Sequence, residues 1–286
     1  ERRPIRPLAD AAWFGEGGRV IACVAFRNFT AMRATSVGLG PFNLVIGPNG
    51  GGKSSLIEVL LRLGELARAT GAVGGWGGGG PATAGAIREE EGRRSPPASA
   101  EHSHRESAPE IDFVFSGHPD VTIRMLRGPD RRHDRVAFAP AGVAIPPELR
   151  TEAAETRGYA LDHTMMAATV PRATGRHLTG NGGNLAATLA GLRLRAPAAF
   201  SALTAEMLRI VPEFHSLELA EHADDRVEFG LRLAGDGLVK ASEMSQGMLY
   251  LLGMLALAFD PEPPRLLCIE DVDRGVHPRI LREVRD

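Results

Sequence analysis

The pattern of apolar and polar positions divides the chain into short strands and amphipathic helices. Val20 to Phe26 is an apolar run that predicts a strand, with Arg27 and Asn28 at its end. The run FNLVIG, residues 42–47, is short, apolar and closed by a glycine, which is typical of a buried parallel strand. From Lys53 onward, apolar residues recur at the spacing of one helix face. They are Leu56, Ile57, Leu60, Leu61 and Leu63.

The remainder of the chain continues this mixture of elements. Residues 111–117 and 121–128 alternate in polarity and predict a hairpin. Residues 148–210 are mostly helical in pattern, with a loop at TGNGGN, and residues 216–241 alternate again and predict strands. A long apolar helix is expected from Met248 to Phe259. We find no internal repeat and no sustained heptad pattern, so a coiled-coil arm is not expected.

Two segments lack the regular apolar pattern of the rest of the chain. Residues 1–18 predict a loose leader. Residues 71–109 are rich in glycine, proline and polar residues and cannot bury enough apolar surface to order themselves, so we expect a mobile loop or linker. His102 and His104 lie within it, where a metal site competes with the favoured interpretation of a solvated polar tract.

Composition narrows the classes of protein. The chain has 286 residues, is 43% hydrophobic and carries a formal net charge of −2, which implies no global attraction to nucleic acid or to an anionic membrane. No apolar run reaches the length of a membrane span and the start is no secretory signal, so a cytoplasmic protein is expected. Cys23 and Cys268 lie in apolar runs and predict buried thiols rather than a disulfide. Because the chain begins at Glu1, we expect a fragment or a processed chain.

A cluster of arginines lies within and just after the predicted hairpin. It could meet nucleic-acid phosphates, but a charged hairpin that faces solvent is the favoured interpretation. The cluster consists of Arg124, Arg127, Arg131, Arg132 and Arg135.

The stretch GPNGGGKS fits the phosphate-loop pattern G-x-x-x-x-G-K-[ST] position by position. Glycines let successive backbone amides point at phosphates, and the following helix adds its positive end. Lys53 is predicted to reach the β- and γ-phosphates of ATP, and the Ser54 hydroxyl to ligate Mg²⁺. The alternative is a plain glycine turn before a helix. The matched residues are Gly47, Pro48, Asn49, Gly50, Gly51, Gly52, Lys53 and Ser54.

Two later stretches add candidate chemistry. LLCIED ends an apolar strand in two acids, which predicts Glu270 near the metal and Asp271 as the group that orients or deprotonates the attacking water. The alternative is a buried strand that ends in a solvated acidic turn. Ser245-Gln246-Gly247 opens the long apolar helix, so its hydroxyl and free amides predict a second place for a γ-phosphate. The alternative there is an ordinary N-cap.

In this order the three motifs resemble one family. The chain is similar to ABC-type ATPase heads of the structural-maintenance-of-chromosomes and recombination-repair class. More narrowly, it resembles stand-alone AAA-family ATPases related to the overcoming-lysogenization-defect ATPases. The matching stretches are FRNFTAM, NLVIGPNGGGKSSLIEVL, GGNLAATL, RIVPEF, MSQGMLYLL and LLCIEDVDRGVHPRIL.

The resemblance implies an α/β head with a mixed sheet, an antiparallel β part and a helical subdomain over residues 148–212. It implies one head over residues 19–286, interrupted by the insert at residues 70–109. Two copies are expected to pair head-to-tail around two ATP molecules. One copy grips each ATP through Gly47 to Ser55, and the other through Ser245, Gln246 and Gly247.

The resemblance also assigns the acids and the partners. Glu270 matches the metal-side acid, Asp271 stands where glutamate is more usual, and His277 matches a loop that faces the partner head. Asp271 is one methylene shorter than glutamate, so slow turnover is expected. The chain ends at Asp286 before the family's next strand and switch histidine, so we expect an incomplete head.

The leading hypothesis is an ATPase coupled to a DNA-directed process, either repair or phage defence, with DNA and a nuclease or other effector as candidate partners and no membrane. This DNA-directed part rests on the resemblance alone. The alternative is a regulatory nucleotide-binding switch with little hydrolysis. A small-molecule kinase has no support, because it would leave the Ser245 motif unexplained.

Overall fold

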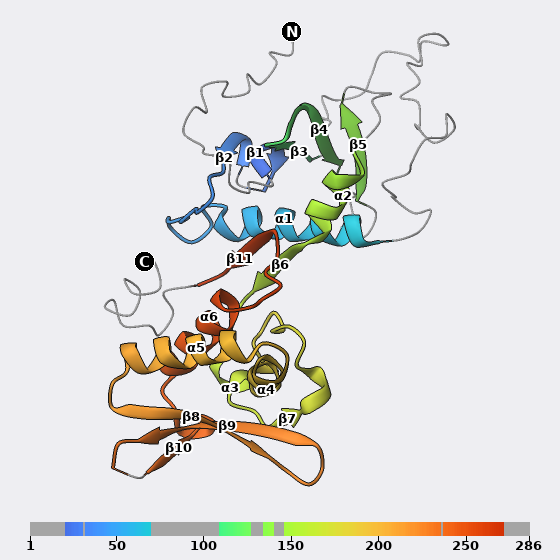
Figure 1. Ribbon diagram of the computed structural model, residues 1–286. Coiled ribbons are helices and arrows are strands. Elements are labelled where there is room, and N and C mark those ends of the chain that lie inside the picture. The colour runs from blue at the N-terminus through green and yellow to red at the C-terminus, as the bar shows by residue number, and fades with distance from the viewer. Residues whose placement is uncertain are drawn as a thin grey trace, which may run out of the picture. The chain divides into compact units, whose positions relative to one another are not determined.

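The computed structural model describes residues 21–30, 32–69, 109–126, 134–139, 146–235 and 237–271 (Figure 1). Contacts divide the chain into two compact units, Glu1–Thr156 and Arg157–Asp286. The predicted leader lies outside the described residues, as does the predicted insert apart from Pro109. The expected single domain over residues 19–286 therefore stays a prediction.

The first unit is built on a five-stranded sheet in which every neighbouring pair of strands is antiparallel. The strand order is β2-β1-β3-β4-β5, and the side chains of Phe26, Phe113 and Ile123 are fully buried. The predicted N-terminal strand and the predicted hairpin are confirmed. The strands are β1 (Ile21–Phe29), β2 (Met32–Gly38), β3 (Glu110–Phe115), β4 (His118–Leu126) and β5 (Arg135–Ala139).

The face of this sheet opposite Phe113 carries a charge network. The Asp112 carboxylate accepts two hydrogen bonds from Arg124, at 2.6 and 2.8 Å, and lies 3.4 Å from Arg27. Arg27 also donates to Glu110 at 3.2 Å. The hydrogen bond to Asp112 raises the pKa of Arg124, so this arginine is held by its own sheet. The side chains of the other predicted cluster members lie outside the described part of the chain. They are Arg127, Arg131, Arg132 and Arg135.

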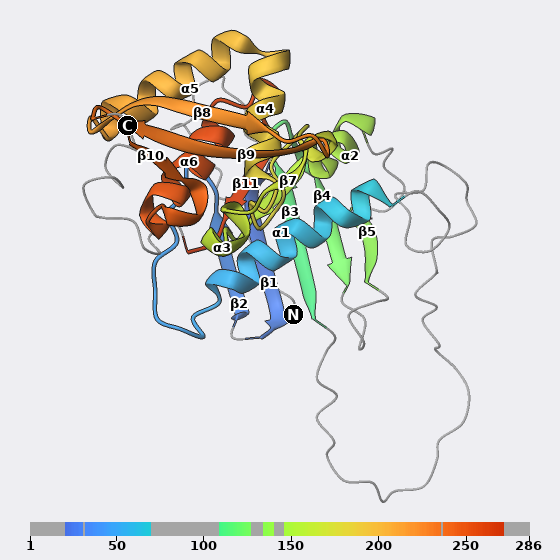
Figure 2. The ribbon, with the colours of Figure 1, turned by 90° about the horizontal axis from the view of Figure 1, so that it is seen from below.

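Helix α1 (Lys53–Arg68) crosses the other face of the sheet, as both views show (Figures 1 and 2). It buries three of the five apolar positions that the helical spacing marked, Leu56, Leu60 and Leu63, so the predicted helix is confirmed. Its last turn is held by helix α2 (Pro147–Ala154), where Arg150 donates to the carbonyl of Ala67 at 2.9 Å.

The run FNLVIG is not a strand, and this prediction is wrong. Residues 43–48 have no regular secondary structure, and the side chains of Phe42 and Ile46 are 73% and 82% exposed. A strand needs a neighbour that completes its ladder of hydrogen bonds, and no described strand pairs with this run. The apolar character of the run indicates a preference for burial, but it does not specify a partner.

The second unit packs helices on one face of an antiparallel sheet (Figures 1 and 2). Its core includes Leu185, Leu203, Leu231 and Leu252, which come from three helices and one strand. The predicted strands and the predicted long helix are confirmed. The elements are α3 (His163–Met166), β7 (Val170–Pro171), the 3-10 turn η1 (Arg172–Thr174), α4 (Leu185–Arg195), α5 (Pro197–Ile210), β8 (Phe214–Glu221), β9 (Arg226–Leu233), β10 (Leu238–Lys240), the 3-10 turn η2 (Ala241–Glu243) and α6 (Gln246–Ala258).

The TGNGGN loop between η1 and α4 is organised around one buried side chain. Asn184 is 5% exposed and uses both ends of its amide. Its nitrogen donates to the carbonyls of Thr174 at 2.6 Å and His177 at 2.8 Å, and its oxygen accepts from the backbone of Thr179 at 2.8 Å. Backbone groups that lack a partner in regular structure are thereby satisfied.

The predicted acid-bearing strand forms as β11 (Leu266–Ile269) and pairs with β6 (Thr156–Tyr159). This two-stranded pair carries the chain into the acids, because the amide of Glu270 donates to the carbonyl of Tyr159 at 2.8 Å. Tyr159 itself is 3% exposed. The position of Glu270 is therefore fixed by main-chain pairing with a buried neighbour.

Candidate functional site

The predicted phosphate loop has the backbone that its glycines allow. Gly50 has φ +79° and Gly52 has φ +92°, both in the region that only glycine adopts without strain. Between them, the amide of Gly51 donates to the carbonyl of Pro48 at 3.1 Å, and a side chain at Gly51 would come within 3.0 Å of that oxygen. The local backbone geometry therefore favours glycine at three successive positions, Gly50, Gly51 and Gly52.

The side chain of Lys53 lies back along the loop. Its ammonium donates to the carbonyls of Gly47 at 2.8 Å and Pro48 at 2.9 Å. An ammonium offers three donors and no acceptor. These two contacts hold the charge at the loop, where a phosphate group would be recognised.

The start of α1 fits a phosphate group. Gly52 is the N-cap and gives no side-chain cap, and the amide of Leu56 makes the first intrahelical bond, to the carbonyl of Gly52 at 3.0 Å. The amides of Lys53, Ser54 and Ser55 thus begin the helix without intrahelical acceptors. The first turn, which is described in full, carries no acidic side chain that would compete for them. Such a helix end favours anions.

A contact that sequence reasoning missed joins this loop to the sheet. The hydroxyl oxygens of Thr30 and Ser55 lie 3.3 Å apart. The side chain of Met32 lies against Gly52, where an added Cβ would meet its sulfur at 3.2 Å. Thr30 and Met32 both belong to FRNFTAM, which carried part of the resemblance, but no spacing rule linked them to residues twenty or more positions later.

The two predicted acids follow β11 directly. Glu270 is partly buried, while Asp271 is exposed and has φ +50°, a left-handed conformation that aspartate tolerates better than most residues. At this left-handed position the side chain of Asp271 is exposed to solvent. Among the described residues, no three histidine, cysteine, aspartate or glutamate side chains gather as a metal site, and His102 and His104 lie outside this range.

The neighbouring thiol gives a pH-dependent prediction. Burial, reinforced by the charge of Glu270, raises the pKa of Cys268 to about 11. The unfolded chain loses this proton near pH 9, so the stabilising effect is complete below pH 9 and is lost as the pH rises to about 11. We expect the free energy of unfolding to fall by up to roughly 2–3 kcal/mol over this interval because of Cys268. Urea titrations of the parent and Cys268→Ala at pH 8 and pH 10.5 measure the difference. Equal pH dependence in the two proteins would contradict the assignment.

Ser245 lies at the start of α6 as predicted. It is the N-cap, and its hydroxyl accepts from the amide of Met248 at 3.3 Å. The residue is exposed, so the capping hydroxyl keeps its own proton available to another acceptor. Gln246 instead turns to its own helix and donates to the hydroxyl of Tyr250 at 3.1 Å. The N-cap alternative is therefore correct as a description of the local structure, and it leaves the predicted role untested.

The predicted site residues are distributed over both units. Gly47 to Ser55 lie in the first unit, whereas Ser245 to Gly247, Glu270 and Asp271 lie in the second. His277 lies outside the described residues. The structure gathers the phosphate-loop residues locally and places each of the other motifs within the second unit.

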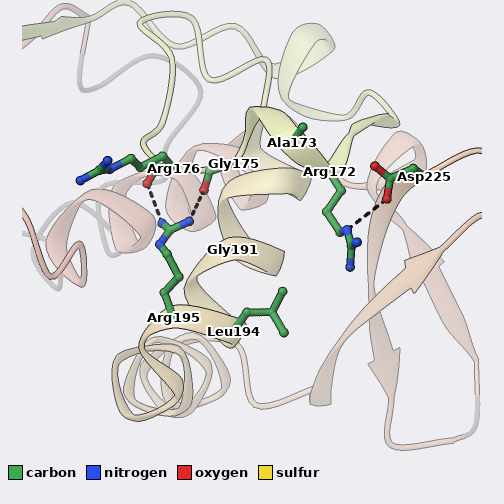
Figure 3. Close-up of a pocket in the computed structure, with 8 residues that line it drawn as sticks. All are labelled: Arg172, Ala173, Gly175, Arg176, Gly191, Leu194, Arg195 and Asp225. Carbon is green, nitrogen blue, oxygen red and sulfur yellow. Dashed lines mark hydrogen bonds and ion pairs between the residues drawn. The ribbon is translucent and has the colours of Figure 1, made fainter.

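A pocket of about 290 Å³ in the second unit carries three arginines that no motif marked (Figure 3). Arg172 pairs with Asp225 at 3.1 Å, and Arg195 donates to the carbonyls of Gly175 at 3.2 Å and Arg176 at 2.7 Å. The pocket also lies at the C-terminal end of α4, which disfavours anions. Arg195 therefore braces the loop against its own helix, while Arg172 is held by Asp225.

The loop, its lysine and its helix define a P-loop nucleotide-binding α/β protein. Residues 42–286 match the family model described as "AAA domain, putative AbiEii toxin, Type IV TA system". The chain belongs to this family, and nucleotide binding follows from that membership. No curated protein matches the chain. No helix among the described residues has the length and apolar character that a membrane crossing requires.

Proposed function

We propose that this protein is an ABC-type ATPase head of the structural-maintenance-of-chromosomes and recombination-repair class, related to the overcoming-lysogenization-defect ATPases. In this proposal it binds and hydrolyses ATP and pairs head-to-tail with a second copy. The observation that carries the proposal is the loop that opens α1, with left-handed Gly50 and Gly52 and with Lys53 folded along it.

In this proposal the loop performs the binding. The free amides at the start of α1 and the Lys53 ammonium surround the phosphate chain of ATP with donors and positive charge. Ser54 supplies a hydroxyl as a ligand for Mg²⁺, with Glu270 on the metal side. A bound Mg²⁺ would supply charge neutralisation to the phosphates.

Asp271 is the proposed general base. Its exposed carboxylate is accessible to water, and its left-handed backbone fixes the direction in which the side chain leaves the strand. The pairing of Glu270 with Tyr159 supports this position from the preceding residue. Asp271 would accept the proton of the attacking water.

Ser245 to Gly247 are proposed to act on the ATP held by the other copy. The supporting observation is that Ser245 caps α6 and is exposed, so its hydroxyl and the positive end of a buried helix point out of the unit. His277 is proposed to face the partner copy. Repair or phage defence, with DNA and a nuclease or other effector, remains the expected setting. The description of the matched family names a toxin, so the role of a toxin is a further candidate.

The second candidate function is a nucleotide-dependent switch with little hydrolysis. Its supporting feature is Asp271, which is one methylene shorter than the glutamate usual in similar heads. Strong ATP-dependent pairing together with very slow turnover would favour this switch over the ATPase.

Ser245→Arg tests the two-copy proposal. The larger, charged side chain should prevent pairing, while ATP still binds to Lys53 and the loop of a single copy. We expect the parent to sediment as a dimer in ATP and Mg²⁺, and Ser245→Arg to remain monomeric with unchanged ATP affinity.

The matched control is Ser201→Arg, which places the same change at an exposed serine of α5. It should pair like the parent. A Ser245→Arg protein that still dimerises and turns over ATP normally would eliminate the two-copy arrangement.

A further inference from the structure

The turn that joins β1 to β2 contacts the phosphate loop. Two contacts join them: the Thr30 and Ser55 hydroxyl oxygens, 3.3 Å apart, and the packing of Met32 against Gly52. Met32 is 8% exposed, so its side chain is largely enclosed by this packing. The hairpin end thus contacts the last glycine of the loop and the first turn of the helix that follows it.

The backbone of this hairpin end is strained. Asn28 has φ +52°, which asparagine tolerates, but Thr30 has φ +47°, where a β-branched residue is uncommon. Between them, Phe29 is 3% exposed and its ring lies 5.8 Å from that of Phe26, centre to centre. A buried aromatic side chain therefore anchors the turn next to Thr30, whose hydroxyl lies against Ser55.

Strain of this kind persists where the surrounding structure enforces it, and it is concentrated at functional positions. In this turn, the surrounding structure places one polar group, the Thr30 hydroxyl, against one residue of the phosphate loop. A substitution that only relieved strain would be expected to stabilise the turn. A substitution that also removed the hydroxyl would disturb the first turn of α1.

We propose that Thr30 is a positioning residue for the phosphate loop. It holds the Ser55 hydroxyl and, together with Met32 at Gly52, sets the direction in which the first amides of α1 point. Thr30 does not touch the nucleotide and acts through Ser55. This proposal rests on the proposed function, because it requires that the loop bind the phosphates of ATP.

The test measures ATP affinity by calorimetry, with Mg²⁺ present, for the parent and three variants of Thr30. Thr30→Val keeps the shape and removes the hydroxyl, Thr30→Ser keeps the hydroxyl, and Thr30→Gly removes both the hydroxyl and the strain. We expect Val and Gly to weaken affinity by about 3- to 10-fold, the effect of one hydrogen bond, and Ser to remain near the parent.

Thermal unfolding without nucleotide separates positioning from folding. Thr30→Gly should unfold no earlier than the parent, because glycine suits the left-handed turn, and yet bind ATP more weakly. If Thr30→Val fails to fold, the glycine variant carries the test alone. Thr35→Val is the control, since Thr35 is exposed on β2 and makes no described hydrogen bond to the loop.

A double substitution identifies the route. In a Ser55→Ala background, Thr30→Val should cause no further loss, because its partner is already gone. An additive loss, or parental affinity in both Thr30→Val and Thr30→Gly, would overturn the positioning role while leaving ATP binding intact. If the parent itself fails to bind ATP, the proposed function falls, and this inference falls with it.

Discussion

Replacing Asp271 with asparagine is expected to lower the rate of ATP turnover by about 10²- to 10⁴-fold, which is the usual contribution of a general base. The amide keeps the shape and the hydrogen-bonding reach of the carboxylate, but it cannot accept the proton of water. The left-handed backbone at Asp271 should survive, because asparagine tolerates it as well as aspartate does. ATP binding should therefore be retained.

Steady-state phosphate release measures the rate of turnover, and calorimetry measures the affinity for ATP. Sedimentation measures the pairing, since ATP that is bound but not cleaved should hold two copies together. Asp225→Asn is a closely matched control, because Asp225 is also an exposed aspartate with φ +59°. Turnover at the parental rate in Asp271→Asn would remove this residue from the chemistry, and a monomer at saturating ATP would argue against the paired heads.

Lys53→Ala is expected to weaken ATP binding by about 10- to 100-fold, as the loss of a charge-assisted contact to phosphate implies. The folded state should be little affected. The contacts of this ammonium are with two carbonyls of an exposed loop, and alanine is a good helix former at the start of α1. The melting temperature without nucleotide should therefore stay close to that of the parent.

The sequence offers one matched control for this change. Lys240 is the only other lysine, and its side chain is 57% exposed. Lys240→Ala should bind ATP like the parent. Equal affinity in Lys53→Ala and the parent, measured by calorimetry, would falsify the loop assignment.

Much of this fold could be predicted from local pattern. Helix α1, the hairpin of β3 and β4, and helix α6 all follow from spacings that need no knowledge of distant residues. The loop itself could be predicted from a short motif, because the left-handed backbone angles that favour glycine at Gly50 and Gly52 are set within a few residues.

The features that could not be predicted depend on partners far along the chain. The run at residues 42–47 has the composition of a strand, but pairing decides whether it becomes one. Thr30 and Ser55 are 25 positions apart, and Tyr159 precedes Glu270 by more than a hundred. Arg124 looked available for phosphates until its register partner, Asp112, was known. Each of these contacts is set by tertiary structure, which no single stretch contains.

The loop around Asn184 also bears on how this fold can be edited. Three main-chain groups, at Thr174, His177 and Thr179, converge on a single amide side chain rather than on a neighbouring strand. A change in the length of this loop would therefore displace several donors and acceptors from the amide at once. In a chimaera between related chains, the segment from Thr174 to Asn184 should be transplanted as one cassette.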